Sequence, residues 1–219
     1  MMADYWSSVI LPMLEGAQMT LLLFFIAIIV SVPLGFLLTL AVNSKIKLFS
    51  WLATIYITIM RGTPLLLQLL IICFGLPMIP GIGEYLTIDR FAAACLGFIL
   101  NYAAYFAEIF RGGLLSIDKG QYEAAKVLGL TKSQTTRKII LPQMFRVALP
   151  SVANESITLI KDTALLYAVA VPELLHFAET AVNRDFSIVP YFIAGAIYLI
   201  MTIILTIFFK WLERRFKYE

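Results

Sequence analysis

Charged residues are scarce in this chain of 219 residues: Asp, Glu, Lys and Arg together make up 14% of it. A soluble globular domain carries about 25% charged residues and about 45–50% apolar ones. Here the hydrophobic share is 61% and the mean hydropathy is +0.89. This composition argues against an ordinary soluble domain and indicates a membrane protein.

Features of several other protein classes are missing as well. No Lys or Arg precedes Lys45, so the basic start of a secretory signal is lacking and we expect no cleaved signal peptide. Cys73 and Cys95 each lie inside an apolar run, which predicts two buried thiols rather than a disulfide or a metal site. The patterns GxxxxGK[ST], HExxH and GxSxG are absent, which argues against P-loop ATP binding and against an intramembrane enzyme.

Long uncharged runs predict helices that cross the bilayer. Residues 20–42 and 188–209 hold 23 and 22 residues without a charge, and roughly 20 apolar residues cross the ~30 Å hydrocarbon core. Residues 91–110 and 147–172 are two further spans with few charges. Ahead of the first span, Tyr5 and Trp6 beside apolar residues fit a separate interfacial helix or a frayed terminus.

Residues 48–78 form the remaining span and need a break. As one straight helix the 32 residues 48–79 would be ~48 Å long, which exceeds one crossing. Gly62 and Pro64 in the sequence MRGTP supply a break near residues 61–64. The sequence therefore predicts a single all-α, polytopic membrane domain over residues 1–219, with five transmembrane helices.

Five spans place the two termini on opposite sides, and the basic residues indicate which side is cytoplasmic. With the N-terminus outside, the inner segments hold thirteen Lys and Arg, whereas the outer loops hold only Arg90 and Arg184. This asymmetry is a strong positive-inside signal. It predicts a cytoplasmic C-terminus and a cytoplasmic loop over residues 112–146. The thirteen inner residues are Lys45, Lys47, Arg111, Lys119, Lys126, Lys132, Arg137, Lys138, Arg146, Lys210, Arg214, Arg215 and Lys217.

The cytoplasmic loop has the local pattern of two short helices. Residues 120–128 are good helix formers, and Gly129 is a natural left-handed stop. Thr131 with Gln134 forms a capping-box pattern that starts the second helix, and Pro142 either ends that helix or begins the next segment. Most helix–helix connections hold 2–8 residues, so a loop this structured is expected to be functional. Its expected exposed apolar edge is Ala125, Leu128 and Leu130.

The same loop carries a known motif. The residues EAA at 123–125 are followed after three residues by Gly129, and after nine more by Ile139-x-Leu-Pro, which matches the EAA motif of ABC importer permeases. The likeness extends over GAQMTL (16–21), RGTPLLLQL (61–69), AEIFRGGLLSIDKGQYEAAKVLGL (107–130) and NESITLIKDTALL (154–166). The chain resembles the permease subunit of a polar amino acid ABC importer, with AVPELL and the segment after it closest to the basic (arginine, histidine, lysine) type.

This resemblance implies a type I ABC importer permease fold and a set of partners. The chain would be a transport subunit rather than an enzyme, without a cofactor of its own, because a partner ATPase in two copies binds ATP and Mg. A second permease copy is expected, since five helices are few to enclose a path, together with an extracytoplasmic amino acid-binding protein, the lipid bilayer and the amino acid, but no nucleic acid. The implied location is the bacterial cytoplasmic (inner) membrane. The residues implied to couple to the ATPase are Glu123, Ala124, Ala125, Gly129, Ile139, Leu141 and Pro142.

Polar residues inside the spans mark a candidate transport path, because charges within a bilayer are costly. The fourth span places its polar residues within an arc of ~120°, the third span has a polar strip that ends at Glu108, and in the second Arg61 and Gln68 are seven residues apart. Lys161 belongs to the arc of the fourth span. The candidate substrate contacts are Arg61, Asn101, Tyr105, Asn154, Glu155, Thr158 and Asp162.

An α-amino acid needs a cation for its carboxylate and an acid for its ammonium group. Arg61, or backbone N–H groups around Thr63, are the candidates for the carboxylate. Glu155 and Asp162 outnumber Lys161 on their face, which mildly favours a cationic side chain on the substrate.

Structural roles remain open for the same residues. Glu108 and Arg111 can form an interfacial ion pair. Lys161 with Asp162 can brace the dimer or a neighbouring helix, and Arg61 can extend to the inner surface. The acids of the fourth span also leave open an ion- or proton-coupled secondary amino acid transporter. The outer segment PELLHFAETAVNRDF is amphipathic and fits a short external helix near the path or a docking surface for a substrate-binding protein, with His176 as an ordinary surface residue.

Overall fold

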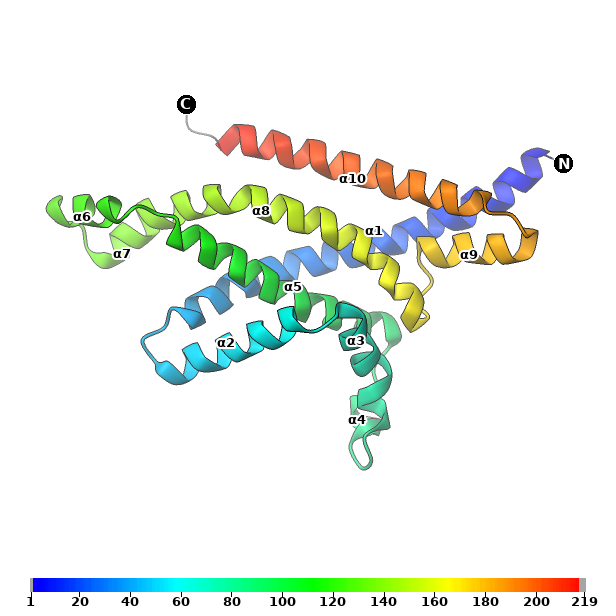
Figure 1. Ribbon diagram of the computed structural model, residues 1–219, viewed down its shortest axis with the longest axis horizontal. Helices are drawn as coiled ribbons and strands as arrows, with labels where there is room; N and C mark the ends of the chain where they lie inside the picture. Colours follow the sequence, from blue (N-terminus) through cyan, green and yellow to red (C-terminus); the bar gives the residue numbers. More distant parts are fainter. Residues whose placement is uncertain (1, 217–219) are drawn as a thin grey trace.

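The computed structural model describes residues 2–216, and within that range the chain forms helices joined by turns, without a β-strand (Figure 1). The predicted all-α class is confirmed. In chain order the elements are α1 (Met2–Val42), α2 (Lys47–Gly62), α3 (Leu65–Leu70), η1 (Ile71–Gly75), η2 (Leu76–Met78), α4 (Gly83–Leu86), α5 (Arg90–Leu115), α6 (Lys119–Val127), α7 (Lys132–Thr135), η3 (Thr136–Ile140), α8 (Leu141–Asp162), η4 (Thr163–Val169), α9 (Leu174–Asp185) and α10 (Val189–Phe216).

The long apolar helices make the chain a polytopic membrane protein. Three helices are each long and apolar enough to cross a membrane alone: α1 over Tyr5–Val42, α5 and α10. Two bent pairs raise the number of candidate spans from three to five when each pair counts as one: α2 with Leu65–Met78, and Lys132–Val169 with α9. The described part of the chain therefore holds three to five spans by length and composition.

The first helix is longer than the sequence suggested. α1 runs for 41 residues without interruption and carries Pro12 and Pro33 inside it, which makes it about 60 Å long. The expectation of a separate interfacial helix or a frayed end around Tyr5 and Trp6 is wrong. Pro12 removes one backbone donor, but no turn-forming run follows it, so the helix continues into the apolar span.

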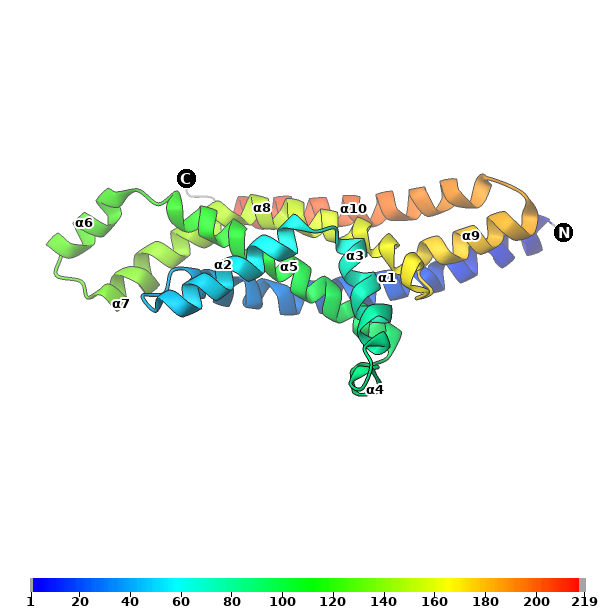
Figure 2. The ribbon, with the colours of Figure 1, turned by 60° about the horizontal axis from the view of Figure 1, so that its bottom comes forward.

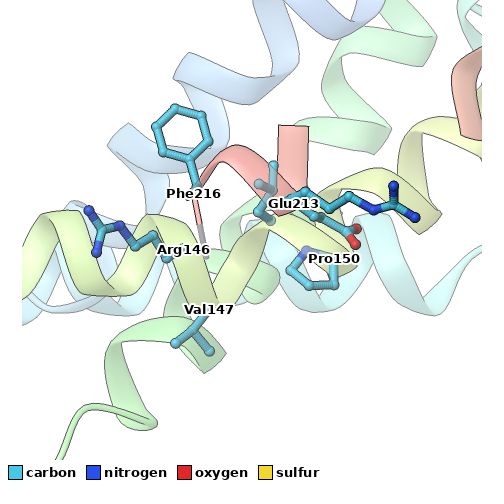
Figure 3. Close-up of a pocket in the computed structure, with 7 residues that line it drawn as sticks. Arg146, Val147, Pro150, Glu213 and Phe216 are labelled. Carbon is cyan, nitrogen blue, oxygen red and sulfur yellow. The ribbon is translucent and has the colours of Figure 1, made fainter. Parts of the chain in front are cut away.

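The second predicted span is bent at residues 63–64. Thr63 and Pro64 have extended backbones, with ψ of 147° and 134°, because Pro64 cannot donate a helical hydrogen bond and disfavours helical geometry at the residue before it. The axis turns by 105° between α2 and Leu65–Met78. As a result, α3 to α4 lead away from the side of the bundle instead of extending α2 (Figures 1 and 2).

α5 lies at the centre of the bundle and makes its most extensive contact with α1. The two helices approach closely at Gly35, where an added Cβ would lie 2.9 Å from the backbone oxygen of Ala103. Next to this crossing, the hydroxyl of Thr39 donates a hydrogen bond of 2.8 Å to the backbone oxygen of Ala107. Small residues and an interhelical hydrogen bond are the usual means of helix association in a bilayer.

The two ends of the bundle differ in what they carry. α6 and α7 form one end, and the N-terminal end of α1 lies with α9 at the other (Figure 1). α7, η3 and α8 follow one another without a gap, so Pro142 stands in the first turn of α8 and begins that helix rather than ending the previous one. The five-residue π-helical segment η3 joins α7 to α8.

Candidate substrate cavity and coupling surface

The break between α2 and α3 borders a cavity of about 520 Å³. Its walls come from the break, from the middle of α5 and from the second half of α8. The lining residues are Arg61, Gly62, Thr63, Pro64, Leu65, Asn101, Tyr102, Tyr105, Glu155, Thr158 and Asp162. Six of the seven candidate substrate contacts named from the sequence therefore lie around one cavity.

Asn154 is the candidate that the structure leaves outside this cavity. It is exposed on α8, as is Lys161, although both fall within the polar arc predicted for the helix. Glu155, Thr158 and Asp162 line the cavity at positions i, i+3 and i+7 of α8 and so share one helical face. The cavity thus meets only one edge of the predicted arc.

Arg61 is the cation of the cavity. Its guanidinium carbon lies 5.4 Å from the centroid of the Tyr105 ring, within the range of a cation–π contact. Its Nη1 atom lies 3.9 Å from Oε2 of Glu108. Arg61 also lines a neighbouring cavity of about 580 Å³ together with Glu108 and Arg111, so the side chain, which is 41% exposed, stands between two cavities.

Glu108 and Arg111 form the ion pair that the sequence left open. Nε of Arg111 donates to both carboxylate oxygens of Glu108, at 3.0 and 2.9 Å, and Nη2 of Arg111 also bonds the same carboxylate. Glu108 therefore balances two guanidinium groups, that of Arg111 closely and that of Arg61 at longer range.

Two carboxylates face Arg61 across the cavity. Oδ2 of Asp162 accepts a 2.7 Å hydrogen bond from the hydroxyl of Tyr102, whereas Glu155 has no hydrogen-bond or ion-pair partner among the residues that the structure describes. With all three groups ionised, the lining carries one positive and two negative charges, a net charge of −1. The lining can thus bind a ligand that bears both a carboxylate and positive charge.

Tyr102 lines the cavity but was not among the residues named from the sequence. It is only 2% exposed and stacks on Phe98, with 6.1 Å between ring centroids. The predicted polar strip followed Asn101, Tyr105 and Glu108, and Tyr102 lies beside that strip. Its bond to Asp162 joins residues 60 positions apart, so no local signal in the sequence indicates it.

The loop between α5 and α8 has the two-helix form that the sequence predicts. The carboxylate of Asp118 caps α6 by accepting from the backbone N–H of Gly120 at 2.6 Å. Gly129 ends the first helix with φ +70°, and the backbone N–H groups of Gly129 and Leu130 bond the oxygens of Lys126 and Ala125. This is a Schellman end, which requires a left-handed residue at the position of Gly129.

The second helix of the loop begins as predicted. The hydroxyl of Thr131 accepts from the backbone N–H of Gln134 at 3.3 Å, and the side-chain oxygen of Gln134 accepts from the backbone N–H of Thr131 at 2.8 Å. The predicted capping box is confirmed.

The apolar edge of the loop differs from the prediction at two residues. Ala125 is 1% exposed, and Leu130 is only partly exposed. Leu128 is 76% exposed as expected, and Val127, which the sequence reasoning passed over, is 88% exposed. Of the other predicted coupling residues, Glu123, Ala124 and Pro142 are exposed, whereas Ile139 and Leu141 are half-buried. We call Val127 and Leu128, with the exposed face of α6 around them, the coupling surface.

The segment after η4 forms α9, and His176 is not an ordinary surface residue. Its ring is half-buried between those of Tyr167 and Phe177, with centroids at 6.4 and 5.5 Å. The fully buried Glu173 caps the helix, accepting 2.9 Å from the backbone N–H of His176 and 2.8 Å from the hydroxyl of Tyr198. This junction fixes α9 against α10.

Residues 31–218 match the family described as "Binding-protein-dependent transport system inner membrane component". The chain belongs to this family. The match covers every element that lines the cavity as well as both helices of the coupling loop. The resemblance drawn from the EAA motif is confirmed at the level of the family.

Two relatives of this transport-system component extend over nearly the whole chain. The arginine transport system permease protein ArtQ of Bacillus subtilis (strain 168) is 39% identical over 205 residues, covering 93% of this chain and 92% of the relative. The glutamine transport system permease protein GlnP of Escherichia coli (strain K12) is 37% identical over 216 residues, covering 97% of each. The two relatives are named for substrates of different charge.

One solved structure shares the fold of this transport-system component closely. The chain in the structure described as "Crystal structure of an amino acid ABC transporter with histidines" superposes with a TM-score of 0.87 at 34% sequence identity. The alignment covers 98% of this chain and 96% of that one. The ABC importer permease fold expected from the sequence is thereby confirmed.

Proposed function

We propose that the chain is the permease subunit of an ATP-driven ABC importer for polar amino acids. The central support is the cavity at the α2–α3 break, which places one guanidinium and two carboxylates inside a bundle of apolar helices. Charges at membrane depth are expensive and mark the path of a substrate or an ion. The names of the relatives, which include arginine and glutamine permeases, agree with an amino acid as that substrate.

The charge of the cavity supports a cationic amino acid as the preferred substrate. Arg61 is placed to receive the substrate's carboxylate, and one of the acids to receive its ammonium group. The cavity holds two acids, Glu155 and Asp162, and Asp162 also accepts a hydrogen bond from Tyr102. When one acid binds the ammonium group, the other leaves one negative charge for a positive side chain. At an effective dielectric constant of about 20, one charge pair at 4 Å is worth about 4 kcal/mol before desolvation. Arginine, lysine and histidine are therefore the proposed substrates.

The α6–α7 loop is the proposed contact with the ATPase subunit. Val127 and Leu128 are exposed apolar side chains on helices that are otherwise charged, and such groups mark a protein-binding surface. The ATPase would supply ATP and Mg, with two ATPase copies serving two permease copies, and an extracytoplasmic binding protein would deliver the amino acid.

The arrangement of the ends supports a cytoplasmic coupling loop. The turn between α1 and α2, the α6–α7 loop and the C-terminal end of α10 occupy the same half of the bundle (Figure 1). These segments, with the adjoining ends of α5 and α8 that carry Arg111 and Arg146, hold the described members of the thirteen inner Lys and Arg. By the positive-inside rule this half faces the cytoplasm, which places the N-terminal end of α1 and α9 outside.

The testing experiment begins with a gentle purification of the C-terminally tagged chain from its native membrane. We expect an ATPase with a P-loop to co-purify in roughly equal amount, as family membership implies. The assembled complex, with its binding protein, is then reconstituted in liposomes and tested for uptake of arginine, lysine, histidine, glutamine and glutamate. ATP-dependent uptake led by the cationic amino acids supports the proposal. Uptake that follows an ion gradient and ignores ATP contradicts it.

A further inference from the structure

The motif RGTPLLLQL contains a side chain that no substrate contact explains. Gln68 lies in α3, one turn past the break, and is only 8% exposed. It does not line the cavity. Its Nε2 atom instead lies 2.9 Å from the backbone oxygen of Met60, 3.2 Å from the backbone oxygen of Thr63 and 2.7 Å from the hydroxyl of Thr63. The side chain of α3 thus bonds back to the end of α2.

The break explains why these acceptors need a donor from elsewhere. The last four carbonyl groups of a helix lack an intrahelical partner. The carbonyl of Met60 would normally receive the N–H of the residue four positions on, which is Pro64 and has none. In a bilayer an unsatisfied carbonyl costs several kcal/mol. Gln68 supplies the hydrogen-bond donor that Pro64 removes.

A second amide comes from α5. Nδ2 of Asn101 donates to the backbone oxygen of Met60 at 3.1 Å and to the side-chain oxygen of Gln68 at 3.0 Å. Asn101 is 3% exposed, and both of its amide hydrogens are occupied by these bonds. The Gln68–Asn101 pair therefore ties α2, α3 and α5 together at the cavity wall, with Asn101 in the lining and Gln68 behind it.

The bonded carbonyls flank the residues that face the cavity. Met60 precedes Arg61, and Thr63 belongs to the cavity lining itself. A shift of this backbone would move Arg61 away from the Tyr105 ring, 5.4 Å from its guanidinium. The position of the cavity's one cation thus depends on two amides, that of Asn101 in the lining and that of Gln68 behind it.

We propose that Gln68 and Asn101 are positioning residues that hold the α2–α3 break in the geometry the substrate requires, with Arg61 as the group that they position. Asn101, named from the sequence as a substrate contact, acts through the backbone rather than on the substrate. The proposal rests on the proposed function in one respect, because it takes Arg61 to be a substrate contact.

The test compares single variants with an exchange of the two amides in the complete permease–ATPase complex. Gln68→Met and Asn101→Leu keep the approximate side-chain volumes and remove the hydrogen bonds. Gln68→Asn with Asn101→Gln shortens one amide and lengthens the other, so the pair can re-form. We expect each single variant to weaken equilibrium binding of L-arginine about tenfold and the exchanged pair to recover most of it.

A second measurement reports the mobility of the α2–α3 break in the absence of substrate. A nitroxide is attached to Gly62→Cys in a background where Cys73 and Cys95 are alanine, and a control nitroxide is attached to Gly112→Cys. An added Cβ meets nothing within 4 Å at either glycine. We expect Gln68→Met and Asn101→Leu to increase nitroxide motion at position 62 and to leave position 112 unchanged, with the exchanged pair reversing the effect.

The two measurements separate the two proposals. A complex that binds no L-arginine in any form overturns the proposed substrate, and the nitroxide spectra then decide the role of the amides alone. Unchanged motion at position 62 in both single variants overturns the positioning role, whatever the binding data show. Equal loosening at both labelled positions also overturns it, because that result reports general destabilisation.

Discussion

The cavity at the α2–α3 break and the coupling surface on α6 depart in opposite directions from the usual placement of charged and apolar side chains. The cavity holds Arg61, Glu155 and Asp162 among apolar helices, whereas the coupling surface exposes Val127 and Leu128 among charged residues. Each arrangement is unfavourable for the isolated chain. The comparison supports the two proposals together, a polar ligand for the cavity and a protein partner for the coupling surface.

The two regions also differ in how their geometry is fixed. The α6–α7 loop depends on local bonds, such as the capping box of Thr131 and Gln134 and the left-handed turn at Gly129. The cavity depends on bonds between distant segments, such as Tyr102 to Asp162 and Asn101 to Gln68. Substitutions in one region should therefore leave the other intact, which the following variants test.

The largest effect is expected from Gly129→Leu. A non-glycine residue in the left-handed region costs roughly 1–2 kcal/mol, and the φ of +70° at Gly129 is required to end α6. We expect ATP-driven uptake to fall about 30-fold or more, while binding of L-arginine to the complex stays within about twofold of the original. Gly112→Ala is the control, because Gly112 is helical and has open space around its Cβ position. Full transport by Gly129→Leu would contradict the coupling role.

The next effect is expected from removing the cavity's negative charges. Glu155→Gln and Asp162→Asn each delete one charge of a lining whose net charge is −1. We expect the ratio of arginine to glutamine uptake to fall about tenfold in each variant, equivalent to roughly 1.4 kcal/mol, with stimulated ATPase activity retained. Lys161→Gln is the matched control on the exposed side of α8. An unchanged ratio in Glu155→Gln would remove that residue from the substrate site.

Local sequence patterns, such as helix caps and turn residues, predict much of the loop and little of the cavity. Gly129, Thr131 and Gln134 act on neighbours within a few residues, so their geometry follows from the sequence alone. Ala125 is the exception, since it is buried at the Schellman end, where its backbone oxygen accepts from the N–H of Leu130. The helix-forming pattern of residues 120–128 does not separate the buried Ala125 from the exposed Val127.

Helical periodicity predicts which faces are polar but not how the faces meet. The arc on α8 correctly grouped Glu155, Thr158 and Asp162, yet it also included Asn154 and Lys161, which the packing of α8 on α5 leaves exposed. Similarly, Pro64 signals a break, but a 105° turn depends on the contacts of α3 with α5. The length of α1 is a further case, because no capping signal interrupts this helix between Met2 and Val42.

A smaller effect is expected from Tyr102→Phe. The ring remains to fill the buried space, but the 2.7 Å hydrogen bond to Asp162 is lost. A hydrogen bond to a charged group contributes about 1.5–3 kcal/mol, and solvent in the cavity can replace part of it. We expect binding of L-arginine to weaken about fivefold. Tyr85→Phe is the control, since Tyr85 is 87% exposed on α4 and lies outside the cavity lining.

The smallest effect is expected from Asn154→Ala, and this variant sharpens the comparison most directly. Sequence periodicity places Asn154 beside Glu155 as a substrate contact, whereas the structure leaves it exposed and outside the cavity. We expect arginine uptake and binding to change less than about twofold, within the usual range for exposed substitutions. Thr158→Ala, one turn away and inside the cavity lining, is the matched variant and should have the larger effect. If Asn154→Ala instead weakens binding as much as Glu155→Gln, the whole polar face of α8 meets the substrate, and α8 must turn relative to α5 during transport.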